Sequence, residues 1–267
     1  MSSSEPQFLD VPRFNSTDVD GPRRIAYIAA PGVNAAKPGL IWLQGFKSEM
    51  VSTKATYLAG WTRERGIGFT RFDYSGHGQS GGRFEDGTIS QWLEEARAVF
   101  EGLTSGPQIL IGSSMGGFLA LLLARALRLE RPDHVPRIAA IVLIAPAWDM
   151  TEALMWPRLP EEAKAAILRD GVWHRPSKYG DGPYPITRAL IEDGRRHRLE
   201  GAGFDPACPV RIIHGVEDTD VPYQHSLGLL DQLRGHDIHL TLVKDGEHRL
   251  SRPQDLALLT AAIEALL

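Results

Sequence analysis

Two serines stand between glycines at residues 112–116, Gly-Ser-Ser-Met-Gly, where a β-branched run gives way to an apolar stretch. The segment fits G-x-S-x-G, a pattern that places a nucleophilic serine on a sharp turn from strand to helix. Glycines on both sides leave room for that turn, and the start of the helix supplies N–H groups suited to a developing oxyanion. The spacing makes Ser114 the predicted nucleophile and Ser113 the variable position.

A serine hydroxyl needs a base to take its proton and an acid to orient that base. On a sheet of this kind, the acid and then the histidine follow the serine along the chain. "HGVEDTDVP" places Asp218 after a late strand-like run, and "DGEHR" places His248 after the last one. Loops at the carboxyl ends of parallel strands meet at one edge of the sheet. We therefore predict a triad of Ser114, His248 and Asp218.

Other carboxylates and histidines compete for these two roles. The rival acids lie beside Asp218 or after an earlier strand: Glu217, Asp220 and Asp149. The rival histidines lie before the last strand, at a strand end, at a helix start or in a loop: His236, His239, His214, His225 and His77. The HGxxDxxVP pattern favours Asp218 as the acid. The place of His248 between the last strand and the final helix favours it as the base.

An oxyanion hole needs a second N–H donor, usually from the loop after an early strand. The segment "LIWLQGFKS" provides such a loop, so the predicted donors are the backbone N–H groups of Phe46 and Met115. The glycine-rich segment "FDYSGHGQSGG", residues 72–82, has neither a GKS/T sequence nor a GxGxxG register. It is therefore predicted to be a structural loop and not a phosphate cradle.

Strand-like and helical patterns alternate along most of the chain. The strand-like runs are rich in Val, Ile and Leu without polar alternation, as is typical of parallel strands covered on both faces. The predicted strands are residues 23–30, 39–44, 67–74, 108–113, 138–145, 209–215 and 238–244. Helical windows start at Thr88, after Ser114 and at Pro253. This alternation predicts an α/β fold with a mainly parallel sheet and helices on both faces.

Residues of about 146–205 interrupt this alternation. No clear strand is predicted there; helical patterns at 160–170 and 185–199 flank a Gly/Pro-rich middle. We expect one domain, 1–267, with this segment inserted as a helical cap. Large apolar side chains gather in the segment: Trp148, Met150, Met155, Trp156 and Trp173. They would suit a hydrophobic acyl pocket, and equally a role in fixing the cap to the sheet.

The composition narrows the class of protein. Hydrophobic residues make up 43% of the 267 residues, charged residues make up 23%, and the net charge is −4. There is no Lys/Arg block to bind nucleic acid. Cys208, the single cysteine, excludes an internal disulfide and a thiolate zinc site, and we expect neither metal nor cofactor.

The first residues resemble neither a signal nor a transit peptide, and no apolar run approaches the ~18 residues of a membrane span. We expect a soluble, cytoplasmic protein; its oligomeric state is not indicated.

Taken in order, "DYSGHGQS", "GSSMGG", "HGVEDTDVP" and "DGEHR" resemble the α/β-hydrolase superfamily from about residue 24 onward. The longer strings "FDYSGHGQSGG", "GPQILIGSSMGG", "GVWHRPSKY" and "CPVRIIHG" resemble its branch of mitochondrial palmitoyl-protein thioesterases and acyl-glucuronide esterases. The resemblance implies Ser114 as nucleophile, Asp218 as acid and His248 as base. It also implies a substrate, a small molecule or an acylated protein, with an acyl chain in thioester or ester linkage.

Two features depart from that branch. The first residues do not resemble a mitochondrial leader, so we do not expect the compartment to transfer, and Gln44 stands where many relatives have a histidine before the oxyanion glycine. The sequence thus predicts a serine hydrolase that forms an acyl-enzyme. The same fold also supports C–C bond hydrolases, peptidases and lyases, or a ligand-binding protein with vestigial hydrolysis. A haloalkane dehalogenase is disfavoured because its nucleophile is an aspartate.

Overall fold

The computed structural model describes residues 5–12, 21–34, 37–176, 182–201 and 203–267. Within them, eight strands form one sheet in the order β1-β2-β4-β3-β5-β6-β9-β10. The strands are β1 (Gln7–Val11), β2 (Arg23–Ala30), β3 (Gly39–Leu43), β4 (Phe69–Phe72), β5 (Gln108–Ser113), β6 (Ile138–Ile144), β9 (Val210–Gly215) and β10 (Ile238–Val243). β2 is antiparallel to both of its neighbours, and the pairs from β4 to β10 are parallel.

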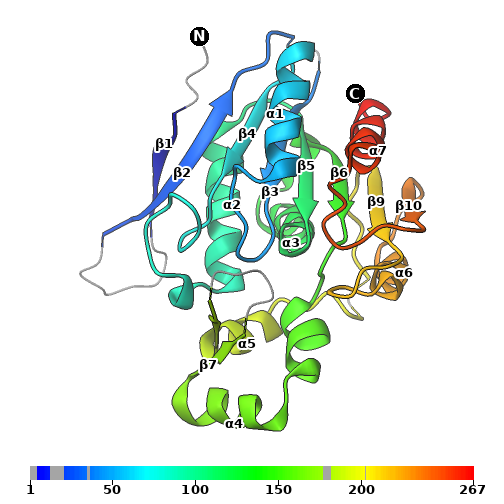
Figure 1. Cartoon of the computed structure of the whole chain (residues 1–267). Helices are drawn as coiled ribbons and strands as arrows, with labels where there is room; N and C mark the ends of the chain where they lie inside the picture. The colour runs from blue at the N-terminus through cyan, green and yellow to red at the C-terminus, as the bar shows by residue number, and fades with distance from the viewer. Residues whose placement is uncertain (1–4, 13–20, 35–36, 177–181, 202) are drawn as a thin grey trace.

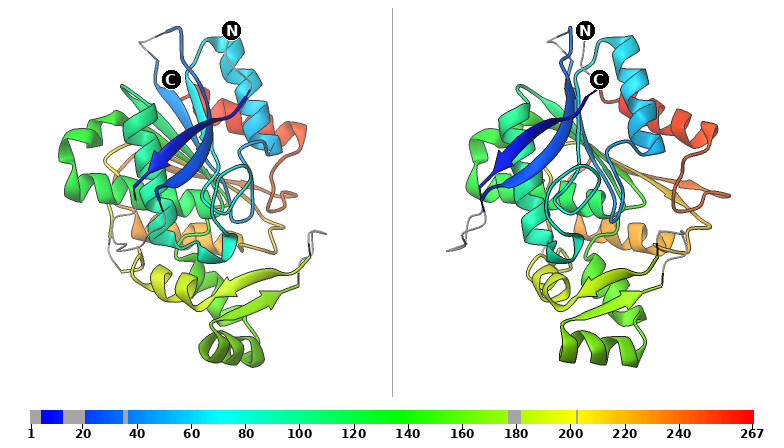
Figure 2. Two further views of the ribbon diagram at one scale, coloured as in Figure 1. Left: turned by 90° about the vertical axis from the view of Figure 1, so that its left-hand side faces the viewer. Right: turned by 60° about the vertical axis from the view of Figure 1, so that its left-hand side comes forward.

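Helices cover both faces of this sheet (Figures 1 and 2). These helices are α1 (Thr53–Arg65), α2 (Ile89–Leu103), α3 (Met115–Glu130), α6 (Tyr223–Gln232) and α7 (Pro253–Glu264). Side chains alternate between the faces: Ile41 of β3 packs in one core with α2 and α3, whereas Leu40 and Trp42 pack in another with α1 and α7. Two apolar cores thus hold the strand ends in fixed positions.

The predicted α/β fold with a mainly parallel sheet is confirmed. Each of the seven predicted strands coincides with an observed one to within two residues at each end. Sequence patterns missed β1, a five-residue edge strand in which Val11 is the buried residue. They also missed α1, because its buried face mixes Leu58 and Trp61 with Lys54 and Thr62, which leaves no apolar stripe.

Between β6 and β9 the chain leaves the sheet and forms a separate layer beyond one end of it (Figure 1). It contains α4 (Glu161–Asp170), β7 (Val172–Arg175), β8 (Tyr184–Thr187) and α5 (Arg188–Arg195), with short helical turns at η3 (Met150–Met155) and η4 (Trp156–Arg158). Further short turns lie outside this region, at η1 (Phe84–Asp86) and η2 (Pro132–Arg137).

The expectation of no strand in this region was wrong. β7 and β8 form an antiparallel pair of four residues each, too short to give a strand pattern. The helix predicted over 185–199 begins at Arg188, because the Thr187 side chain caps it by accepting the Leu190 N–H at 3.1 Å. A small apolar core of its own holds the region together: Leu159, Ala163, Ile167, Ile186 and Ile191. Among the described residues, no helix is both long and apolar enough to cross a membrane.

Candidate active site

Ser114 stands at the sharp turn between β5 and α3, with φ 54° and ψ −118°. A positive φ is strained for serine, so the surroundings must hold it. Its N–H donates to the Ile144 carbonyl at 2.8 Å. A side chain at Gly112 would collide with the Gly116 backbone, and one at Gly116 would collide with the Leu43 carbonyl. The two glycines are therefore required by the close approach of three backbone segments.

His248 lies in the loop between β10 and α7, at the same edge of the sheet. Its Nε2 is 3.2 Å from Ser114 Oγ, and its Nδ1 is 2.7 Å from Asp218 Oδ2. With Nδ1–H donating to the carboxylate, Nε2 keeps a lone pair that can accept the serine hydroxyl. The His248 side chain is 22% exposed, while that of Asp218 is fully buried. The structure thus brings together the three side chains that the sequence singled out.

The Asp218 carboxylate is fixed by hydrogen bonds on both oxygens. Oδ1 accepts the Asp220 N–H at 2.9 Å and the Val221 N–H at 2.8 Å. Burial alone would raise the pKa of Asp218, but the hydrogen bonds from His214 and His248 outweigh it and hold this pKa well below its usual range. The carboxylate is therefore charged at neutral pH and can stabilise an imidazolium beside it.

A second histidine contacts the same carboxylate, which sequence patterns did not predict. His214 is fully buried at the end of β9, with Nε2 3.2 Å from Asp218 Oδ2 and 2.8 Å from the Val221 carbonyl. Its Nδ1 lies 2.6 Å from the Ser226 hydroxyl. An Nε2–H tautomer satisfies all three partners, since Ser226 then donates to Nδ1. In the sequence, His214 is the histidine of the HGxxD pattern, and its fixed distance from Asp218 could have indicated this contact.

The loop after β3 lies against the nucleophile. A Cβ at Gly45 would lie 3.3 Å from Ser114 Cβ. Phe46 follows in a turn closed by the Ser48 N–H to the Gly45 carbonyl at 3.1 Å. On the other side, Met115 is the first residue of α3, where N–H groups have no partner within the helix. The predicted donors, Phe46 and Met115, therefore both come from segments adjoining Ser114.

Comparisons with known proteins identify the family of this chain. The sequence profile of the family described as serine aminopeptidase, S33, matches residues 37–176. Palmitoyl-protein thioesterase ABHD10, mitochondrial, of Bos taurus is 34% identical over 241 residues, which cover 90% of this chain and 76% of the relative. The chain belongs to the α/β-hydrolase family.

Two solved structures resemble this α/β hydrolase over nearly its whole length. Alpha/beta hydrolase domain-containing protein 10 from mouse has a TM-score of 0.82 and 32% identity, covering 98% of each chain. A crystal structure of a protein from Agrobacterium vitis S4 has a TM-score of 0.91 and 43% identity, also covering 98% of each chain.

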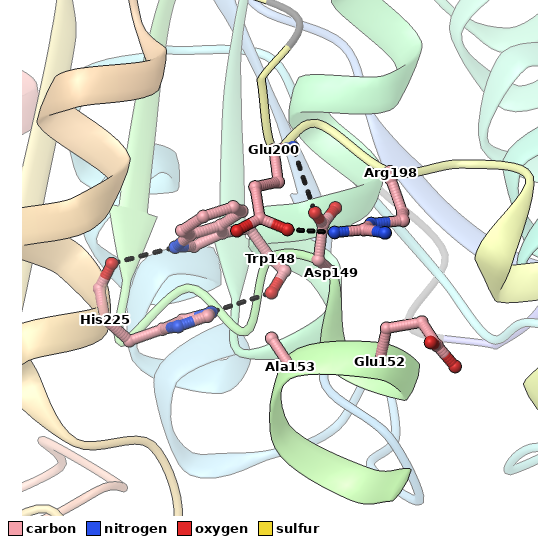
Figure 3. A pocket seen from close by; sticks show the side chains of 7 residues that line it. All are labelled: Trp148, Asp149, Glu152, Ala153, Arg198, Glu200 and His225. Carbon is pink, nitrogen blue, oxygen red and sulfur yellow. Dashed lines mark hydrogen bonds and ion pairs between the residues drawn. The ribbon is translucent and has the colours of Figure 1, made fainter. Parts of the chain in front are cut away.

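The rival acids of the hydrolase lie elsewhere or contact other groups. Asp149 accepts the N–H groups of Leu199 at 2.7 Å and Glu200 at 3.0 Å, so it holds the chain that leaves the inserted region (Figure 3). Glu217 is exposed, and Asp220 gives its N–H to Asp218.

The rival histidines likewise stand apart from Ser114. His236 and His239 are exposed around the start of β10. His225 lies in the first turn of α6, where its ring stacks on Trp148 at 4.6 Å. His77 is buried in the predicted structural loop, and burial lowers its pKa to about 4, so its ring is neutral.

Burial also raises the pKa of the Cys208 thiol to about 12, which leaves the thiol protonated.

The five apolar residues predicted to bind substrate divide into two groups. Trp148 and Met150 are buried in the main core, where Trp148 also donates through Nε1 to the His225 carbonyl at 2.8 Å. Trp156 and Trp173 pack at the edge of the small core of the inserted region, and Met155 packs against both cores. The structure therefore does not gather all five around one space.

A cavity of about 370 Å³ lies beside Trp148 (Figure 3). Most of its lining is polar: Trp148, Asp149, Glu152, Ala153, Arg198, Glu200 and His225. Such a lining does not suit an acyl chain. Among the described residues, no group of three or more His, Cys, Asp or Glu side chains is arranged to hold a metal ion.

Proposed function

We propose that this chain is a serine hydrolase that cleaves carboxylic thioesters or esters through an acyl-enzyme. The observation that carries the proposal is the continuous contact from Ser114 Oγ to His248 Nε2, 3.2 Å, and from His248 Nδ1 to Asp218 Oδ2, 2.7 Å. The strained backbone of Ser114 at the start of α3, which is typical of a nucleophilic serine on this fold, supports the same proposal.

In the first half-reaction, Ser114 Oγ attacks the acyl carbonyl carbon while its proton moves to His248 Nε2. Asp218 stabilises the resulting imidazolium, and the N–H groups of Phe46 and Met115 receive the negative charge that develops on the carbonyl oxygen. His248 then gives the proton to the departing thiolate or alkoxide, which leaves the acyl group on Ser114. Water repeats these steps in the second half, releasing the carboxylic acid and restoring the serine.

The substrate class is proposed from the relatives and the inserted region together. Five curated relatives, 34–35% identical to this chain, are named palmitoyl-protein thioesterases, which supports an acyl thioester, on a protein or a small molecule, as substrate. We propose that residues of about 146–205 form a cap on a single 1–267 domain. Within it, Met155, Trp156 and Trp173 are the predicted contacts for an acyl chain. Trp148 and Met150 would contact the same chain from the main core.

The compartment of the proposed hydrolase is a separate prediction. The five palmitoyl-protein thioesterases are named mitochondrial proteins. For this chain we propose the cytoplasm as the compartment.

The test is Ser114→Ala beside Ser113→Ala, which changes the neighbouring serine of β5. A fluorophosphonate probe should label wild type and Ser113→Ala, and leave Ser114→Ala unlabelled. We expect kcat/KM for p-nitrophenyl butyrate to fall by at least about a thousandfold in Ser114→Ala, because the attacking oxygen is gone. A panel of acyl thioesters, p-nitrophenyl esters and an acyl glucuronide then ranks the linkages.

The panel also separates the alternative functions. Labelling of Ser114 without turnover of any ester or thioester would favour a C–C bond hydrolase, a peptidase or a lyase on this fold. Folded protein that neither reacts with the probe nor hydrolyses an ester would overturn the proposal and favour a ligand-binding protein.

A further inference from the structure

Two serine–histidine pairs meet at the Asp218 carboxylate, and the proposed mechanism uses one of them. In the catalytic pair, Ser114 Oγ lies 3.2 Å from His248 Nε2, and His248 Nδ1 lies 2.7 Å from Asp218 Oδ2. In the second pair, Ser226 Oγ lies 2.6 Å from His214 Nδ1, and His214 Nε2 lies 3.2 Å from the same Oδ2. One carboxylate oxygen therefore faces both imidazole rings.

The direction of each hydrogen bond around His214 follows from its partners. The Val221 carbonyl, 2.8 Å from Nε2, can only accept, so Nε2 carries the hydrogen and Nδ1 accepts from the Ser226 hydroxyl. Both the Val221 carbonyl and Asp218 Oδ2 lie within reach of this Nε2–H. His214 is fully buried, so its contact with Oδ2 is shielded from solvent, which strengthens the electrostatic effect of the contact.

The Asp218 carboxylate has other bonds that hold it in place. Its Oδ1 accepts the backbone N–H groups of Asp220 at 2.9 Å and Val221 at 2.8 Å. These two donors belong to the loop that carries the carboxylate, so they hold it whatever side chain stands at position 214. The particular contribution of His214 is a second donor on Oδ2, the oxygen that binds the catalytic histidine.

A second donor changes what Oδ2 can do in the reaction. The carboxylate must stabilise the His248 imidazolium without taking the proton from Nδ1. A hydrogen bond donated to a carboxylate oxygen stabilises the charged form and makes that oxygen a weaker proton acceptor. The positive end of the His214 N–H dipole, close to Oδ2, also offsets part of the attraction between Asp218 and a protonated His248.

We propose that His214 is a positioning residue that acts through Asp218: its Nε2–H holds Oδ2 and offsets part of the negative charge there, so that His248 remains an unprotonated base down to a lower pH. The proposal rests on the proposed hydrolase function. It gives the histidine of the HGVED segment, residues 214–218, a part in the reaction in addition to its place in the core.

Other groups around the triad also affect the titration of the base. Charged and titratable side chains come from the two loops of the triad, from α1 and from α6: Glu217, Asp220, Glu247, Arg249, Lys54 and His225. Burial lowers the pKa of His225 to about 4, so its ring stays neutral at neutral pH. None of these groups changes when position 214 is substituted, so their effects cancel when variants at that position are compared.

A matched pair of side chains of similar shape tests the proposal. His214→Gln keeps an N–H donor at the place of Nε2, whereas His214→Met fills the same space without a donor. In His214→Met we expect the acid limb of kcat/KM for p-nitrophenyl butyrate to move to higher pH by about 0.5–1 pH unit, since Oδ2 then stabilises the imidazolium more strongly. In His214→Gln the limb should stay within about 0.2 pH unit of wild type. The plateau kcat of both should stay within about tenfold of wild type, because the triad is intact.

The sign of the shift separates this role from simple packing. A loosened loop would weaken the contact between Asp218 and His248, which would move the acid limb to lower pH or leave it in place while kcat falls. An unshifted or lowered limb in His214→Met, or equal shifts in His214→Met and His214→Gln, would overturn the proposal.

The rate at which a fluorophosphonate probe labels Ser114 gives a readout that does not depend on ester turnover. Labelling also needs unprotonated His248, so its rate should show the same limb and the same shift in His214→Met. Wild type that is labelled but hydrolyses no ester marks failure of the proposed substrate class alone, and the labelling rates still decide the role of His214. Wild type that is not labelled would overturn both proposals.

Circular dichroism and thermal unfolding check the fold of each variant. Should His214→Met fail to fold, His214→Asn takes its place, because asparagine can still contact Ser226 but is too short to reach Asp218 Oδ2. The same upward shift is expected in His214→Asn. Failure of both variants to fold would assign His214 a structural role and overturn the proposal.

Discussion

At the scale of single residues, the charge on Asp218 has a specific origin. Its oxygens receive hydrogen bonds from two backbone N–H groups and two histidines, which hold its pKa well below the usual range despite burial. The carboxylate therefore stays ionised through the pH range in which a catalytic histidine titrates. It also fixes His248 with Nδ1–H toward the acid and Nε2 toward Ser114.

Replacing this acid should remove most of the activity without loss of the fold. In Asp218→Asn the amide can donate to Nδ1 and so favours the wrong tautomer of His248, and the imidazolium loses its counter-charge. We expect kcat for p-nitrophenyl butyrate to fall by about 10⁴-fold, with a smaller change in KM. Glu217→Gln, at the exposed neighbour, is the control and should keep wild-type kcat. Similar losses in both variants would contradict the assigned role of Asp218.

At the scale of elements, α1 reaches across to the loop that carries His248. Lys54, in the first turn of α1, is buried, and its ammonium donates to the Arg249 carbonyl, the residue after His248. Burial lowers the pKa of Lys54 from 10.5 to about 8; Arg249 lowers it further, while Glu247 and Asp255 oppose the change. Arg252 holds the same loop from its other end through Asp245 and Asp255. The loop of the proposed base is thus fastened to two helices.

The lowered pKa of Lys54 makes stability depend on pH in a defined window. Between about pH 8 and 10.5 Lys54 binds its proton in the unfolded chain but not in the folded one, so the contribution of Lys54 to the free energy of unfolding rises with pH, whereas the raised pKa of Cys208 acts in the opposite direction. At about 1.4 kcal/mol per pKa unit, this rise amounts to roughly 3 kcal/mol. Urea unfolding across this range should show this rise as a growing difference in the free energy of unfolding between wild type and Lys54→Met.

Lys244→Met is the matched control, because Lys244 is exposed at the end of β10. It should follow the wild-type curve. If wild type and Lys54→Met instead run parallel from pH 8 upward, Lys54 is not the group responsible.

Sequence patterns predicted those elements whose stability comes from long apolar runs. β5 and β6 are buried along nearly their whole length and stand out as β-branched stretches. β7 and β8 have four residues each and form because they pair with one another, a contact that no local pattern records. The same distinction applies to the site: spacing along the chain selected Ser114, Asp218 and His248. The contacts of His214, His77 and Lys54 depend on which loops the fold brings together.

At the scale of the whole molecule, the inserted region is joined to the sheet domain at a helix end. The Asp193 carboxylate of α5 accepts the Ser90 N–H and the Ser90 hydroxyl, each at 2.7 Å. Ser90 is the second residue of α2, so the carboxylate faces the positive end of that helix. A second junction lies at the oxyanion loop, where the rings of Phe46 and Tyr184 of β8 are 5.9 Å apart. The inserted region therefore touches the segment that carries a proposed oxyanion donor.

Asp193→Ala should loosen the first junction. It removes a buried carboxylate and leaves the Ser90 N–H without its acceptor, so we expect the free energy of unfolding in urea to fall by about 1–3 kcal/mol. Limited proteolysis should then cut within residues 146–205 earlier than in wild type. Glu192→Ala, an exposed site on the same helix, should change stability by less than about 0.5 kcal/mol. If the two variants are equally stable and equally resistant to protease, the Asp193 carboxylate does not hold the inserted region to α2.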